Sequence, residues 1–171
     1  MMKNARWALV LLLSAGLSGA SAEGRLPLTQ AVTAGDTQGV RTLLAKPGTD
    51  VNATEADGST ALHYAANRGD AGVVTALLAA GADVKVANRY GVTPISLACA
   101  NGSVAVVASL LKAGADVNTV TVGGQTLLMT AARSGTPELI RLLLIQGAKV
   151  NAQETTRGQS EIGRASCRER V

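Results

Sequence analysis

Apolar residues follow the same spacing three times along the middle of the chain. They recur at gaps of one, three and four residues, which places their side chains on one face of an α-helix. Each copy is therefore expected to hold a helix with one buried stripe. The three stripes are Val73, Val74, Leu77 and Leu78, then Val106, Val107, Leu110 and Leu111, then Leu139, Ile140, Leu142, Leu143 and Leu144.

A shorter helix is predicted before each stripe, at roughly Thr60 to Asn67, Thr93 to Asn101 and Thr126 to Ser134. A glycine ends each one, because glycine adopts the left-handed conformation without a steric penalty. The residue after that glycine is expected to cap the next helix with its side chain. Four residues take this position: Asp36, Asp70, Ser103 and Thr136. Small residues on the short helices are expected to be buried: Ala65 and Ala66, Ala98 and Cys99, Ala131 and Ala132.

The whole pattern repeats with a period of 33 residues, from Gly58 to Gly91 and from Gly91 to Gly124. Such a period indicates that units stack to build a continuous core. A degenerate unit before Gly58 resembles a terminal cap. The predicted organisation is a signal peptide at 1–22, a capping repeat at 23–57, repeats at 58–90, 91–123 and 124–157, and a broken repeat with a tail at 158–171.

The motif Gly-x-Thr-x-Leu-x-x-Ala-Ala-x-x-Gly, followed by a Val/Leu-rich helix and Gly-Ala-Asp-Val, resembles the ankyrin repeat. The resemblance covers residues 26 to about 160. It implies an all-α solenoid of helix-turn-helix units with short β-hairpin fingers at 52–59, 85–92 and 118–125. The first helices of the units are expected on the concave side.

The resemblance also implies a binding surface for another protein, across the finger tips and the concave helix face. Tyr90 beside Arg89 is the best anchor, because exposed Tyr and Arg are frequent interface hot spots. The alternative for Tyr90 is a ring packed on the neighbouring finger. Carried over by position, the partner-binding residues are Ala56, Asp57, Ser59, Asn67, Arg68, Arg89, Tyr90, Val92, Asn101, Val122, Gln125, Arg133 and Ser134.

The charge of the chain argues against a nucleic-acid partner. The net charge is +4, but residues 23–160 hold 11 basic and 10 acidic side chains, so this part is nearly neutral. There is no Phe, and Tyr64 and Tyr90 are the only aromatic residues besides Trp7. This part of the chain therefore has no large excess of positive charge, and the chain lacks a stacking platform for bases.

No constellation of catalytic residues is predicted, and neither a cofactor nor a metal is expected. His63 is the only histidine, so a two-histidine metal site is impossible within this chain. The resemblance implies a structural role for His63, in which it hydrogen-bonds neighbouring turns. Cys99 is predicted to be a small buried hydrophobe rather than a reactive thiol.

Residues 1–22 have the features of an export signal: Lys3 and Arg6, an apolar run from Trp7 to Leu17, and an Ala20-Ser-Ala22 cleavage site. The run is too short for a transmembrane helix, so no stable membrane insertion is expected after cleavage. The alternative is a retained membrane anchor. Residues 161–171 resemble a translated sequencing-adapter oligonucleotide, with a native charged tail as the alternative.

The leading hypothesis is a periplasmic or secreted binding module without enzymatic activity, monomeric when its repeats are capped. A second hypothesis is the targeting arm of a larger secreted enzyme or effector, whose catalytic domain is expected beyond a truncation near Ser160. A third is a self-assembling scaffold.

Overall fold

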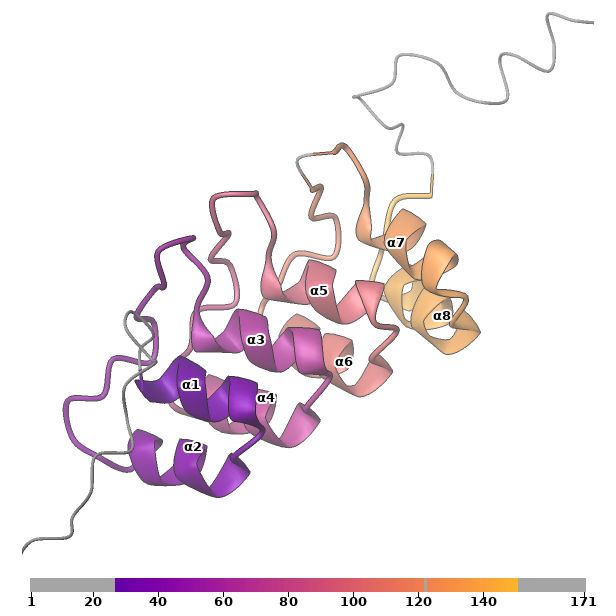
Figure 1. Cartoon of the computed structure of the whole chain (residues 1–171). Helices are drawn as coiled ribbons and strands as arrows, with labels where there is room; N and C mark the ends of the chain where they lie inside the picture. Colours follow the sequence, from indigo (N-terminus) through magenta and orange to yellow (C-terminus); the bar gives the residue numbers. More distant parts are fainter. Residues whose placement is uncertain (1–26, 122, 151–171) are drawn as a thin grey trace, which may run out of the picture.

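The computed structural model describes residues 27–121 and 123–150. They form helices in four consecutive pairs, joined by tight turns within a pair and by longer loops between pairs (Figure 1). The helices are α1 (Pro27–Ala34), α2 (Thr37–Leu44), α3 (Ala61–Arg68), α4 (Ala71–Ala79), α5 (Pro94–Ala100), α6 (Val104–Lys112), α7 (Leu127–Ser134) and α8 (Pro137–Ile145).

The pairs stack side by side and form two layers. In the first-helix layer, α1 contacts α3, α3 contacts α5 and α5 contacts α7. In the second-helix layer, α2 contacts α4, α4 contacts α6 and α6 contacts α8. The inter-pair loops all project from the same side of the stack (Figure 1). The predicted all-α solenoid is confirmed, and it is built from contacts between neighbouring units.

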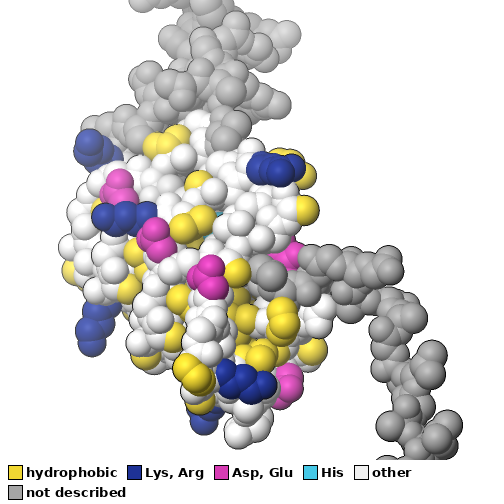
Figure 2. Space-filling view, turned by 90° about the vertical axis from the view of Figure 1, so that its left-hand side faces the viewer, with side chains coloured by type: hydrophobic (Ala, Val, Ile, Leu, Met, Phe, Trp, Pro, Cys, Tyr) yellow, Lys and Arg dark blue, Asp and Glu magenta, His cyan; other side chains and the backbone are white. Residues whose placement is uncertain are grey.

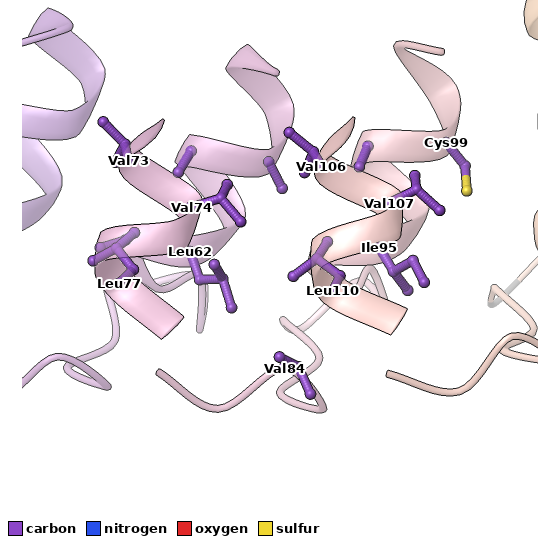
Figure 3. Close-up of a cluster of buried hydrophobic side chains, with 14 of the residues drawn as sticks. Leu62, Val73, Val74, Leu77, Val84, Ile95, Cys99, Val106, Val107 and Leu110 are labelled. Carbon is purple, nitrogen blue, oxygen red and sulfur yellow. The ribbon is translucent and has the colours of Figure 1, made fainter. Parts of the chain in front are cut away.

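The core lies between the layers and repeats from one pair to the next. Val74 and Leu77 of α4 are fully buried, and so are Val107 and Leu110 at the same positions of α6. Figure 3 shows these side chains in the same arrangement in both pairs. The buried residues of the first helices include small ones, since Ala65, Ala98 and Ala131 are also fully buried. Small residues there let the two layers approach closely.

The turns within the pairs confirm the predicted glycines and two of the four predicted caps. Gly69 has φ of +71°, and the Asp70 carboxylate accepts a hydrogen bond from the Val73 amide at 3.0 Å. Asp36 caps α2 in the same way. Ser103 and Thr136 occupy the N-cap positions of α6 and α8, but their side chains make no capping bond. For these two residues, the prediction of a side-chain cap is wrong.

The fingers, which are the loop segments 52–59, 85–92 and 118–125, share one closing geometry. The bonds Glu55 N–H to Ser59 O, Asn88 N–H to Val92 O and Thr121 N–H to Gln125 O are 2.9, 3.0 and 2.9 Å long. Pairing between strands is limited to two isolated antiparallel bridges in the described residues, Thr54 with Thr60 and Val120 with Thr126. The fingers are therefore tight turns with minimal strand pairing, and no β-sheet forms among the described residues.

The α7–α8 pair is the last one described, and its outer side is open. Ala132 is exposed, whereas its counterparts Ala66 and Cys99 are fully buried beneath the following pair. The expectation that Ala132 is buried is therefore wrong for the described residues. Leu144 and Val150 are likewise 43% and 69% exposed. The predicted signal peptide, the tail, Cys167 and Val122 lie outside the described residues.

Candidate functional site

The first two fingers are joined by hydrogen bonds that begin at Asp57. Its carboxylate accepts from the Ser59 amide and the Ser59 hydroxyl, both at 2.9 Å. The bond from the Ser59 amide holds the pKa of Asp57 below its ordinary value of 3.8. The Asn88 side-chain amide then donates to the Ser59 hydroxyl oxygen at 3.2 Å, and the Arg89 amide donates to the Asp57 carbonyl at 2.9 Å. The predicted binding residues Asp57 and Ser59 therefore position the second finger.

Asn88 also shapes the tip of the second finger. Its side-chain oxygen accepts hydrogen bonds from the Tyr90 and Val92 amides, each at 3.0 Å. The backbone on both sides of the tip is therefore held, while the tip side chains project outward. Arg89 is exposed, and Tyr90 is 67% exposed, so most of its surface is in contact with solvent. Val92 is half-buried at the base of this finger.

His63 links α3 to the second finger from beneath. The Thr60 amide donates to Nδ1 at 3.1 Å, so Nδ1 carries no proton and Nε2–H donates to the Val92 carbonyl at 3.0 Å. The side chain is 2% exposed. Burial lowers the pKa of His63 below its usual 6.5, although the bond to Val92 and the charge of Asp57 act in the opposite direction. The structural role implied for this histidine is what the geometry shows.

Arg68 and Asn101 occupy the same position in successive repeats and make the same kind of contact. Arg68 donates to the Thr33 carbonyl at 3.2 Å, near the C-terminal end of α1. Asn101 donates through its side-chain amide to the Asn67 carbonyl, near the C-terminal end of α3. Carbonyls at helix ends lack a partner within their helix, so each side chain satisfies an oxygen of the preceding repeat. Both residues, and Asn67, are exposed.

In the third repeat, Arg133 and Ser134 lie on α7, and Gln125 lies at the end of the third finger. Arg133 is exposed and donates to the Gln125 side-chain oxygen at 2.9 Å. Its side chain therefore runs back along α7 toward the base of the third finger. Ser134 takes the Arg68 position, but its hydroxyl donates to the Ala131 carbonyl of its own helix at 2.8 Å. The structure gives no position for Val122.

Three residues on the exposed face of the first-helix layer were missing from the prediction. Tyr64 and Leu97 take equivalent positions on α3 and α5 and are half-buried, and Ala100 is exposed. Tyr64 lies one helical turn before Asn67, and Leu97 lies one turn before Ala100, which takes the Asn67 position on α5. Helical spacing alone could therefore have located these residues. They supply apolar surface beside the polar residues of the prediction.

Reactive groups are scarce in the part of the chain that the structure describes. No group of three or more His, Cys, Asp or Glu side chains there could hold a metal ion. Cys99 is fully buried, and burial raises the pKa of its thiol to about 12. A thiol with this pKa is almost entirely protonated at neutral pH and is a weak nucleophile.

Comparison with known proteins gives two findings. The family model described as "Ankyrin repeats (3 copies)" matches the chain in three overlapping segments, residues 3–88, 28–121 and 62–154. The chain belongs to the ankyrin-repeat family. No curated protein matches this ankyrin-repeat chain. Ankyrin repeats generally mediate protein–protein interactions and are typically non-catalytic.

One end of this ankyrin-repeat protein carries a mixed surface. Seen from the end that carries α1 and α2, charged side chains of both signs lie scattered among apolar ones (Figure 2). None of the described helices is long and apolar enough to cross a membrane. The exposed residues of the prediction lie on the second finger tip, with Arg89 and Tyr90, and on the first-helix layer, with Arg68 among others.

Proposed function

We propose that this ankyrin-repeat protein binds another protein through the tip of its second finger and the adjoining face of the first-helix layer. The observation that supports the proposal is the pair Arg89 and Tyr90. Their backbone is held by Asp57 and Asn88, while 67% of the Tyr90 surface is exposed. An aromatic side chain on a pre-positioned backbone loses little conformational entropy when it binds.

We further propose that the protein acts in the periplasm or outside the cell. The support is the sequence of residues 1–22, with its basic start, its apolar run and its cleavage motif. Expression of the full chain in a bacterial host, followed by osmotic shock, tests this proposal. The released protein is expected to have the intact mass of a chain that begins at Glu23. A full-length mass in the membrane fraction would contradict export with cleavage.

The binding proposal is tested by affinity capture from a periplasmic extract with the exported chain as bait. Arg89→Ala with Tyr90→Ala is the test variant. The matched control is Lys112→Ala with Ile145→Ala, which removes one cation and one exposed apolar side chain from the second-helix layer; Ile145 is 80% exposed. Circular dichroism and the melting midpoint establish that both variants are folded.

We expect a protein that the wild type and the control variant capture and that the test variant loses. Loss of one aromatic or Arg anchor at an interface typically costs about 2 kcal/mol or more, which is a loss of affinity of over tenfold. Equal capture by the test variant and the wild type would show that the second finger is not the contact.

A further inference from the structure

Charged side chains are distributed unevenly over the surfaces that would meet a partner. On α1, α3, α5 and α7 the only charged side chains are Arg68 and Arg133, because His63 is buried and neutral. These four helices contain no Asp or Glu. The second finger adds Lys85 and Arg89, and neither the second nor the third finger contains an acidic residue.

The carboxylates near this surface lie outside these four helices and outside the second and third fingers. Glu55 and Asp57 lie on the first finger, where Glu55 accepts a bond from Thr29 and Asp57 binds Ser59. Asp83 and Asp116 lie before the second and third fingers, and each accepts from the backbone amide two residues further along. The stack therefore changes from an acidic first finger to a cationic region that comprises the second finger and α7.

The two arginines of this region stand beside apolar neighbours. Arg89 precedes the exposed Tyr90 on the second finger. Arg133 lies along α7, and the equivalent position on the adjacent α5 is Ala100, with Leu97 one turn away. A guanidinium has five N–H donors and pairs well with a carboxylate, so the single bond from Arg133 to Gln125 leaves donors for a ligand.

From this juxtaposition we infer that the partner presents an acidic, partly apolar linear segment to the second finger and to the adjoining face of α5 and α7. In such a segment, carboxylates alternate with aromatic or aliphatic side chains. The carboxylates meet Arg89 and Arg133, and the apolar side chains meet Tyr90, Leu97 and Ala100. The inference rests on the proposed function, because it specifies the chemistry of the same binding surface.

The test uses a library of random short peptides displayed on phage, selected on the exported chain. Arg89→Glu with Arg133→Glu reverses the two charges of the proposed region. Lys112→Glu with Arg141→Glu makes the same change of charge on the second-helix layer and serves as the control.

We expect selection of peptides in which Asp and Glu are over-represented beside aromatic or aliphatic residues. In fluorescence anisotropy, the most enriched peptide is expected to bind the test variant at least about tenfold more weakly. The control is expected to bind it nearly as the wild type does.

The binding is also expected to weaken as salt is added, because exposed charges are screened. Three results would overturn the inference: selected peptides without an excess of acid, an equal loss in both charge-reversed variants, or no selected peptide. A single-stranded DNA oligonucleotide of similar charge is a further probe. Equal binding of the DNA and the peptide would also overturn the inference, since only general anion binding would remain. If, in any of these cases, capture of a protein from the extract still requires Tyr90, the proposed function is retained. Only the inference of an acidic segment is then rejected.

Discussion

His63 connects the protonation state of one side chain to the packing of one repeat on the next. Its Nδ1 accepts the Thr60 amide bond, and its Nε2–H donates to the Val92 carbonyl of the following repeat. A second proton can bind only at Nδ1, where it would face the N–H of Thr60. The folded state therefore resists protonation of this side chain, in addition to the effect of burial.

The sign of the effect follows from the lowered pKa. The unfolded chain takes up a proton as the pH falls through the ordinary histidine value of 6.5, and the folded chain does so only at a lower pH. The stabilisation is therefore complete above that value, and acidification removes it until the pH reaches the pKa of the folded state. One proton bound only by the unfolded state lowers the free energy of unfolding by at most about 1.4 kcal/mol per pH unit.

The measurement is urea unfolding between about pH 7.5 and about pH 5, above the range in which most carboxylates titrate. The wild type is expected to lose stability as the pH falls. His63→Gln keeps an amide that can accept and donate but has no ionisable group, so its free energy of unfolding is expected to change little over this range. Asp57 does not interfere, because its pKa lies below 3.8 and its own contribution is lost only at more acidic pH. Parallel pH profiles for the two proteins would refute the reasoning.

Two further predictions concern the core. Leu110→Ala removes a fully buried side chain and is expected to cost about 2–5 kcal/mol in urea unfolding, whereas Leu144→Ala, at a 43% exposed position, is expected to cost clearly less; equal costs would contradict the described packing. In a Cys167→Ser background, Cys99 is expected to react with a thiol reagent only after denaturant is added, because it is buried and the pKa of its thiol is raised to about 12. Rapid labelling of the native protein would show that the repeat around α5 opens.

The regular part of the fold follows from the local sequence. The apolar spacing located the second helices, and the glycines located the helix ends, because both signals act within one or two turns of the chain. The period of 33 residues then implied stacking, since no single unit can bury its own stripe. The capping prediction is confirmed for Asp36 and Asp70. It is wrong for Ser103 and Thr136, whose short hydroxyl side chains lie at the N-cap without bonding to the helix.

The candidate binding surface could be predicted less well, because its contacts join residues about one repeat apart. Arg68 and Asn101 differ between repeats and so seemed suited to recognition, yet both satisfy a carbonyl of the preceding repeat. Asn88 is not among the predicted binding residues, but in the structure its side chain holds the backbone of the finger that presents Tyr90.

By itself, the sequence determined the helix pairs, their order and the all-α solenoid, because these depend on spacing and on the conformational preferences of single residues. Only the tertiary structure decided which polar side chains support the stack and which remain available to bind a partner. That division depends on hydrogen bonds such as Asn88 to Ser59 and His63 to Val92, which form only after neighbouring fingers and helix pairs have packed.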